Sequence, residues 1–166
     1  MNVQQGIRLA VMALLLTRAG WASGDEGTFE SLFNGQDLTG WQGDPEIWTV
    51  QDGVITARTT ADNPLTSNTF LVWQGGSVGD FELELDYRIV GGNSGIQYRS
   101  RLIDSEKWIV GGYQADIESG DTYSGILYEE RGRGILARRG QLVEFDPQGK
   151  KCAVTFASSA DLQAKI

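Results

Sequence analysis

The chain alternates apolar and charged side chains along the stretch Phe81-Glu82-Leu83-Glu84-Leu85-Asp86-Tyr87-Arg88-Ile89. Its five odd positions are apolar and its four even positions are charged. Because successive side chains of a strand point to opposite faces, this period of two predicts a β-strand with one face on a core and the other in water. Such a strand belongs in an outer sheet or at a sheet edge.

The same period recurs along most of the chain. Residues 48–51 and 54–57 are separated by Asp52-Gly53, a pair that accepts the positive φ angles of a two-residue hairpin turn. Glycine-rich turns separate further expected strands at 69–73, 94–100, 112–117, 124–130, 141–145 and 152–156. Only residues 158–164 outside the leader suggest a short helix. Many short strands at regular spacing predict an all-β sandwich.

Residues 1–22 have the pattern of a secretory signal peptide. Arg8 supplies the positive charge, residues 9–16 form an apolar run, and Gly20-Trp21-Ala22 resembles a cleavage site. The apolar run is far shorter than the ~20 residues of a membrane-spanning helix. We therefore expect an exported protein, periplasmic or extracellular, with no membrane association after signal removal and a single domain over residues 28–166.

Composition excludes several classes of chemistry. The 166 residues contain 22 acidic and 14 basic side chains, a formal charge of −8, and no histidine. The lack of histidine excludes Ser-His-Asp and Cys-His nucleophiles and the usual imidazole zinc sites. The acidic balance argues against a nucleic-acid partner, because phosphate neutralisation needs a basic face. The single cysteine, Cys152, is expected to be a buried apolar side chain of the last strand.

Each of three expected strands carries one polar face by the same alternation. These faces contain Gln97, Arg99 and Arg101; Gln114, Asp116 and Glu118; and Glu129 and Arg131. If the strands are neighbours, the faces merge into one patch, which three tryptophans could flank: Trp41, Trp73 and Trp108. Such a patch suits a sugar, whose hydroxyls need paired donors and acceptors and whose ring faces stack on aromatic planes. The alternative is a solvated outer face, which we expect for Glu82, Glu84 and Asp86.

Two further motifs carry weaker signals. Gly132-Arg133-Gly134-Ile135-Leu136-Ala137 has the form of a dinucleotide-binding loop, but that loop must open a helix, and strand-like sequence follows here. Asp116, Glu118 and Asp121 could gather around Ca²⁺, although their spacing does not fit a calcium loop and an ordinary acidic turn explains them better.

Six blocks in their order and spacing point to a family. They are FESLFNGQDLTGW (29–41), WTVQDGVI (48–55), DFEL (80–83), GNSGIQYRS (92–100), GGYQAD (111–116) and GILYE (125–129). Together they resemble the 3-keto-disaccharide hydrolase family from residue 28 to about residue 141. The resemblance implies a concanavalin A-like jelly-roll sandwich of two antiparallel sheets with its site on the concave sheet. Members of that family continue with more strands, so the chain is expected to lack its C-terminal strands.

The resemblance also implies action on glycosides oxidised at C3, as direct hydrolysis or as 1,2-lyase and then hydratase. A C3 ketone acidifies the C2 proton, so a carboxylate can remove it and the C1 substituent can leave. We expect Glu129 or Asp116 as the base and the other as the acid. An arginine, Arg99 or Arg131, or a bound metal would stabilise the enolate.

Substrate contacts are expected from Arg99, Gln114, Arg131, Gln97 and Trp108. The expected partner is a small carbohydrate. No cofactor is expected, with a divalent cation such as calcium as an open alternative. A non-catalytic carbohydrate-binding module and a structural interaction domain are the two alternative functions.

Overall fold

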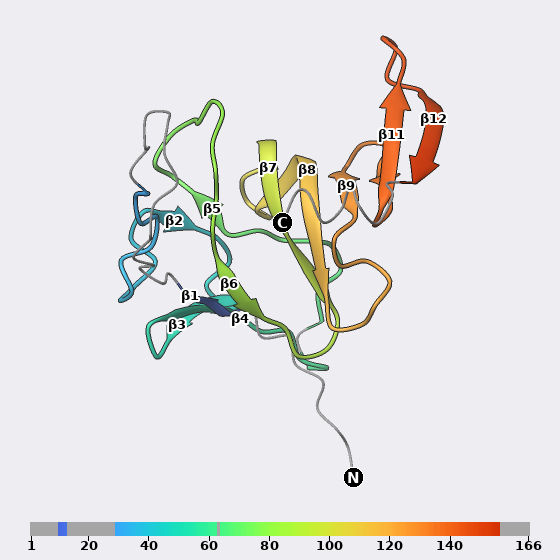
Figure 1. Cartoon of the computed structure of the whole chain (residues 1–166). Coiled ribbons are helices and arrows are strands. Elements are labelled where there is room, and N and C mark those ends of the chain that lie inside the picture. Colours follow the sequence, from blue (N-terminus) through green and yellow to red (C-terminus); the bar gives the residue numbers. More distant parts are fainter. Residues whose placement is uncertain (1–9, 13–28, 63, 157–166) are drawn as a thin grey trace, which may run out of the picture. The chain divides into compact units, whose positions relative to one another are not determined.

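A computed structural model describes residues 10–12, 29–62 and 64–156. These residues form twelve β-strands and no helix, and all of the strand pairings are antiparallel (Figure 1). The predicted all-β class is confirmed, and the several antiparallel sheets are consistent with a β-sandwich. The chain divides into two compact units, Met1–Val90 and Gly91–Ile166.

Unit 1 contains a four-stranded sheet in the order β3-β4-β1-β6 and a two-stranded sheet of β2 and β5. The strands are β1 (Ala10–Met12), β2 (Trp41–Gln42), β3 (Trp48–Gln51), β4 (Val54–Ala57), β5 (Val72–Trp73) and β6 (Asp86–Arg88). In the β3–β4 hairpin Gln51 pairs with Val54, and the turn residues Asp52 and Gly53 have φ angles of 52° and 74°. The hairpin and its turn are as predicted, because this pair tolerates the required φ.

Strand β1 lies within the segment predicted to be a signal peptide. Its Val11 pairs with Ile55 of β4 and with Tyr87 of β6. The rest of that segment lies outside the described residues, as does the short helix expected at 158–164. The signal peptide therefore stays a prediction. In the described part of the chain, no helix is long and apolar enough to cross a bilayer.

Two expected strands of unit 1 are shorter than predicted. Within the described part of the chain, the stretch 81–89 joins a ladder only at β6, which is at the edge of its sheet, and the stretch 69–73 does so only at β5. Phe81 and Leu83 are 46% and 44% exposed. Alternation shows that a segment can present one apolar face. A strand also needs a partner strand with which to form hydrogen bonds, and residues 81–85 have no such partner among the described residues.

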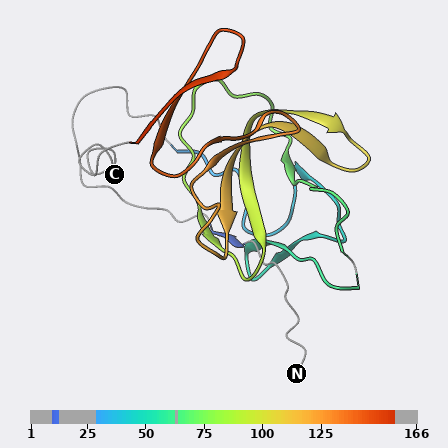
Figure 2. The same cartoon turned by 90° about the vertical axis from the view of Figure 1, so that its right-hand side faces the viewer.

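Unit 2 contains the sheet that carries most of the candidate residues. Its order is β10-β9-β8-β7, and a separate hairpin of β11 and β12 follows. The strands are β7 (Asn93–Asp104), β8 (Ile109–Glu118), β9 (Leu127–Glu130), β10 (Gly134–Ala137), β11 (Gln141–Phe145) and β12 (Lys151–Phe156). The hairpin projects beyond the sheet in both views (Figures 1 and 2). Buried apolar side chains of this unit are Val110, Ile117, Ile126 and Leu136.

Cys152 is exposed on β12. Its thiol lies 3.4 Å from the carbonyl oxygen of Glu144 on β11. The prediction of a buried thiol was wrong, because β12 pairs only with β11 among the described residues and the hairpin leaves most of the side chains of β12 in solvent.

Candidate functional site

The three strands with polar faces are neighbours, as the patch hypothesis requires, but their register divides the patch. On one face Gln97 pairs with Gln114, which in turn pairs with Tyr128. On the other face Tyr113 pairs with Glu129. Since alternate residues of β8 share a face, Asp116 lies with Gln114, and Glu129 lies on the opposite side of the sheet.

The expected single patch with Asp116 and Glu129 side by side is therefore wrong. Alternation assigned the faces within β8 and β9 correctly, but it does not say which face of one strand joins which face of the next. A register shift of one residue exchanges the faces of a strand. The two carboxylates cannot act as base and acid on one substrate from opposite sides of a sheet.

A β-bulge in β7 moves Arg101 as well. The register shifts between Tyr98, which faces Tyr113, and Arg101, which faces Gly111. The extra residue places Arg101 on the same face as Tyr98, not on that of Gln97, which corrects the expected row of donors. Arg99 in the bulge has a φ of 46°, a conformation that is costly for a residue with a side chain.

Gly112 makes the close approach at this bulge possible. A Cβ atom at this position would lie 2.3 Å from Ser100 Oγ and 2.6 Å from Ser100 Cα. Its φ of 153° is also one that side chains disfavour. Only glycine lets the backbone of β7 approach β8 so closely at the bulge.

A chain of hydrogen bonds runs across the Gln97 face. Ser100 Oγ donates to Gln97 Oε1 at 2.8 Å, and Gln97 Nε2 donates to Gln114 Oε1 at 2.8 Å. Gln114 Nε2 then donates to Asp116 Oδ1 at 2.5 Å. Gln114 and Asp116 are buried, so these bonds satisfy polar groups that water does not reach.

Burial raises the pKa of Asp116 above its ordinary value, and the hydrogen bond from Gln114 opposes this rise. The nearby charges of Glu118 and Glu130 raise the pKa of Asp116 further. Burial and the neighbouring like charges both favour the neutral acid, because each of them penalises the carboxylate.

A hollow of about 400 Å³ lies at the bulge, and we call it the first hollow. Its lining residues are Arg99, Ser100, Arg101, Gly111, Gly112, Tyr113, Glu129, Glu130, Arg131 and Gly132. It brings together three of the predicted site residues, Arg99, Glu129 and Arg131. Of the others, Gln97 and Gln114 reach it only through Ser100, Asp116 lies at the far end of the same chain, and Trp108 is in the β7–β8 turn.

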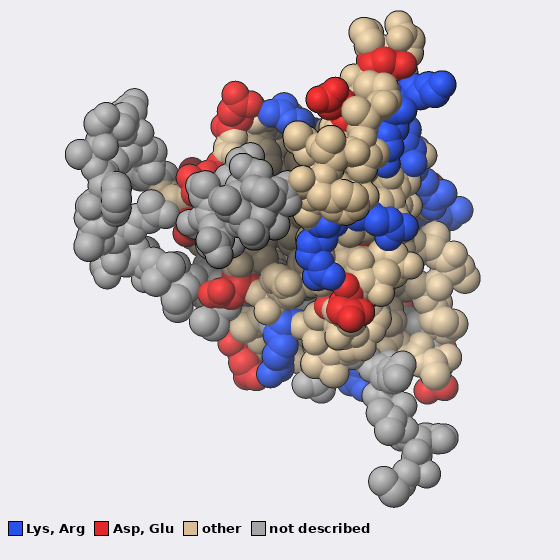
Figure 3. Space-filling view, turned by 45° about the vertical axis from the view of Figure 1, so that its right-hand side comes forward, with Lys and Arg blue, Asp and Glu red and all other residues tan. Residues whose placement is uncertain are grey.

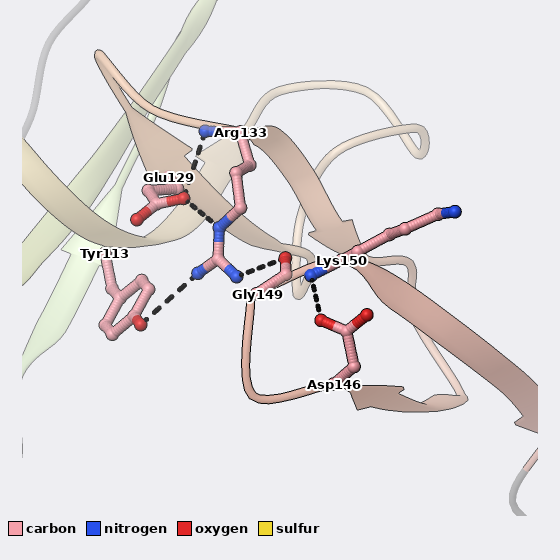
Figure 4. Close-up of polar contacts among 6 residues, drawn as sticks. All are labelled: Tyr113, Glu129, Arg133, Asp146, Gly149 and Lys150. Carbon is pink, nitrogen blue, oxygen red and sulfur yellow. Dashed lines mark hydrogen bonds and ion pairs between the residues drawn. The ribbon is translucent and has the colours of Figure 1, made fainter.

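Arg133 fixes the carboxylate of Glu129 (Figure 4). The backbone N–H of Arg133 donates to Glu129 Oε2 at 3.0 Å, and its Nε donates to the same oxygen at 2.5 Å. Two further bonds from the guanidinium reach the Gly149 carbonyl oxygen at 3.1 Å and the Tyr113 hydroxyl at 3.4 Å. The hydrogen bonds from Arg133 lower the pKa of Glu129, so this carboxyl group stays ionised.

Sequence reasoning missed Arg133. The residue appeared only inside the motif 132–137 that resembles a dinucleotide loop, and residues 134–137 of that motif form strand β10. The available signal was its spacing, because Arg133 follows Glu129 by four residues across the tight β9–β10 turn. Gly132 in this turn leaves room for Glu129, since a Cβ atom there would lie 2.6 Å from Glu129 Cδ.

A second hollow, of about 530 Å³, shares Arg99 and Tyr113 with the first. Its other lining residues are Tyr98, Leu127, Arg133, Leu136, Phe145, Asp146, Pro147 and Gly149. The rings of Tyr98 and Tyr113 are 5.9 Å apart, and the Arg133 guanidinium lies 4.9 Å from the centre of the Phe145 ring. At Asp146 the side chain accepts the backbone N–H of Lys150 at 2.8 Å and closes the β11–β12 turn (Figure 4).

The aromatic side chains beside the candidate site are thus not the expected tryptophans. In unit 1, Trp41 pairs with Trp73 between β2 and β5. No tryptophan of the described residues lines either hollow, and the aromatic residues that do are Tyr98, Tyr113 and Phe145. The strand pattern gave no reason to prefer these residues, because alternation alone assigns Tyr98 and Tyr113 to an apolar face.

The structure gives no support to the calcium hypothesis. Among the described residues, no group of three or more acidic or cysteine side chains could hold a metal ion. Glu118 instead accepts the backbone N–H of Tyr123, and its own N–H donates to Ser124 Oγ at 2.9 Å. Asp116 and Glu118 therefore belong to β8, and Asp121 lies in the hydrogen-bonded turn that follows.

Comparison with known proteins identifies the family. Residues 28–157 match the family model of the 3-keto-alpha-glucoside-1,2-lyase-like domain. No curated protein and no solved structure matches the chain. The match covers most of the 166 residues and agrees with the blocks from residue 29 to residue 129. The chain therefore belongs to the family of 3-keto-alpha-glucoside-1,2-lyase-like domains, which is associated with glycoside-processing enzymes.

Proposed function

We propose that this protein cleaves 3-keto-glycosides by abstraction of the C2 proton and elimination of the C1 substituent, followed by hydration. The observation that carries the proposal is the first hollow, in which an ionised glutamate fixed by Arg133 lies among arginines. A base and a cation in one site are what enolate formation beside a ketone requires. The family match supports the same chemistry.

The reaction balances without a cofactor. The base removes the C2 proton, and the electrons of that bond form an enolate with the C3 carbonyl. The enolate then expels the C1–O substituent, which takes up a proton and leaves a C1–C2 double bond conjugated to the ketone. Water adds a hydroxyl group at C1 and a proton at C2, so the net reaction is hydrolysis.

Glu129 is the proposed base. Arg133 holds only its Oε2 atom, and Oε1 has no hydrogen bond among the described residues. This arrangement orients the carboxylate and leaves one oxygen to accept a proton. The low pKa keeps Glu129 ionised, and its basicity suffices only for a C–H bond that the adjacent ketone has acidified.

Arg99 and Arg131 are proposed to stabilise the enolate oxygen, since both line the first hollow. Tyr113 is the proposed proton donor to the leaving oxygen, because its hydroxyl accepts a bond from Arg133 and so keeps its own proton free to donate. Asp116, Gln114 and Gln97 are proposed to act through Ser100, whose hydroxyl they orient at the edge of the hollow.

The test uses two substrates with the same chromogenic aglycone, a 3-keto-glucoside and the unoxidised glucoside. We expect aglycone release from the keto substrate alone, because only the ketone acidifies the C2 proton. Release from both substrates would contradict the elimination chemistry and favour an ordinary glycosidase. Binding without release, by a folded protein, would contradict catalysis and favour a non-catalytic carbohydrate-binding module.

We further propose that the protein is exported to the periplasm or the outside of the cell. The support is the charge and apolar pattern of residues 1–22. Expression of the full chain in a bacterial host, followed by N-terminal sequencing of the exported fraction, tests this proposal. A mature chain that begins at Ser23 is expected, and an uncleaved protein confined to the cytoplasm would contradict it.

A further inference from the structure

The first hollow is rich in arginine, although the chain as a whole carries a charge of −8. Arg99, Arg101 and Arg131 line it together with Glu129 and Glu130. Figure 3 shows Lys and Arg side chains gathered on the side of unit 2 turned toward the viewer, with acidic side chains beside them. An acidic protein that concentrates arginines around one hollow favours an anion there.

Both glutamates of the hollow already have a cationic partner. Glu129 is paired with Arg133, and Glu130 Oε1 lies 3.5 Å from Arg131 Nε. Arg99 and Arg131 are assigned to the enolate of the proposed reaction, and Arg101 is the third arginine of the lining. Its charge is left for another group of the substrate.

Arg101 is the cation best placed for that group. It is exposed, it lines the hollow, and its side chain makes no hydrogen bond or ion pair with any described residue. The bulge at Arg99 and Ser100 brings it to the face of Tyr113 and Glu129. The two non-glycine residues with positive φ that lie in this hollow, Arg99 and Arg131, flank the same space. Backbone strain of this kind persists where the surroundings hold it, and it is concentrated at ligand sites.

We infer that the first hollow selects 3-keto-glycosides that bear a carboxylate, and that Arg101 binds this carboxylate. The inference rests on the proposed function. A guanidinium matches a carboxylate with two parallel hydrogen bonds. A carboxylate carries the single negative charge that Arg101 balances, whereas a phosphate dianion would exceed it.

The first test measures binding by the full chain and requires no turnover. Titration calorimetry compares methyl glucuronide with methyl glucoside, which differ in the carboxylate at C6. We expect the glucuronide to bind at least about tenfold more tightly than the glucoside, because a charge-assisted hydrogen bond contributes that much affinity. The Arg101→Gln variant should lose most of this advantage, and Arg101→Lys, which keeps the charge without the planar fork, should fall between.

Arg138→Gln is the matched control, because Arg138 is an exposed arginine of the same unit outside both hollows. This variant should keep the full preference for the glucuronide. Equal binding of the two sugars by the unmodified protein would overturn a carboxylate at C6, and with it the inference unless the aglycone pair of the second test shows an Arg101-dependent preference for the acid. A preference that survives in both Arg101 variants would overturn the assignment to Arg101.

The second test measures kcat/KM and distinguishes the two places where a carboxylate can sit. One pair of 3-keto substrates differs at C6, a glucuronide against a glucoside with the same aglycone. The other pair differs in the aglycone, para-carboxyphenyl against para-carbamoylphenyl. A preference for the acid in either pair that depends on Arg101 supports the inference. Cleavage of all four with no such preference would overturn it and leave the proposed function standing. Arg101-dependent binding of the glucuronide with no cleavage of any keto substrate would contradict the proposed function alone.

Discussion

The substitution Gly95→Ala tests whether the buried hydrogen-bond chain of unit 2 is built as described. Gly95 pairs with Asp116 across β7 and β8. A Cβ atom on Gly95 would lie 2.5 Å from both Cγ and Cδ of Gln114. This is about 1 Å closer than carbon atoms tolerate. Gln114 must therefore move and give up its bonds to Gln97 and Asp116.

The loss of stability is estimated from the buried polar groups that lose their hydrogen-bond partner when the Gln114 amide moves. A buried polar group without a partner costs about 1–3 kcal/mol. Alanine in place of a strand glycine returns roughly 0.5–1 kcal/mol, because it lowers the entropy of the unfolded chain. The midpoints of these two ranges give a net loss of about 1 kcal/mol in the free energy of unfolding. For a chain of this size, that lowers the melting temperature by roughly 2–4 °C.

Urea denaturation followed by tryptophan fluorescence measures the change. Gly120→Ala is the control, because a Cβ atom there meets only Glu118 at 3.5 Å, which is an ordinary contact. The control should keep or slightly raise stability, because it lowers the entropy of the unfolded chain without a clash. A Gly95→Ala variant as stable as the unmodified protein would refute the packing of Gln114 against β7.

Three more predictions follow from single residues. Glu129→Gln should lower kcat by about 10²- to 10⁴-fold with little change in KM, because it removes the base; a loss below tenfold, or an equal loss in the exposed control Glu144→Gln, would argue against this role. Asp116→Asn should stabilise the protein relative to the unmodified chain increasingly as pH rises above 3.8, the ordinary pKa of this group. The pKa of Asp116 is raised in the folded protein, so the unmodified protein gains stability from the neutral acid at low pH and loses that stability as pH rises through the raised pKa. A difference in unfolding free energy between the variant and the unmodified protein that stays flat from pH 3 to pH 8 would contradict a raised pKa. The exposed Cys152 should react with a maleimide in the native protein as fast as in urea, and protection until unfolding would contradict its placement.

Patterns of period two were enough to predict the fold class and most of the elements of unit 2. The β3–β4 hairpin was predictable to the residue, because Asp52-Gly53 fixes both the turn and the register. The stretch 81–85 shows the limit of the same signal. Its apolar side chains alternate well, yet a ladder partner is a long-range property that alternation does not contain.

The candidate site was less predictable for the same reason. Residues Arg99, Glu129 and Arg131 do meet in the first hollow. Asp116 does not join them. Which face of β9 lies beside the Asp116 face of β8 depends on the register between the two strands, and the sequence does not determine that register. The alternation of side chains along β7 does not predict the bulge that redirects Arg101. The bulge is evident only from the structure, in which Gly112 of β8 lies opposite to it.

The proposed chemistry is tested most directly by the fate of the hydrogen at C2. A 3-keto-glucoside deuterated at C2 is incubated with the full chain in ordinary water, and released deuterium and released aglycone are measured together during early turnover, against a sample without enzyme. Elimination followed by hydration predicts that one deuterium enters the solvent for each aglycone released, and that the Glu129→Gln variant slows both by the same factor. Aglycone release with the deuterium retained at C2 of the sugar would show direct hydrolysis and contradict the role of Glu129 as the base for this proton.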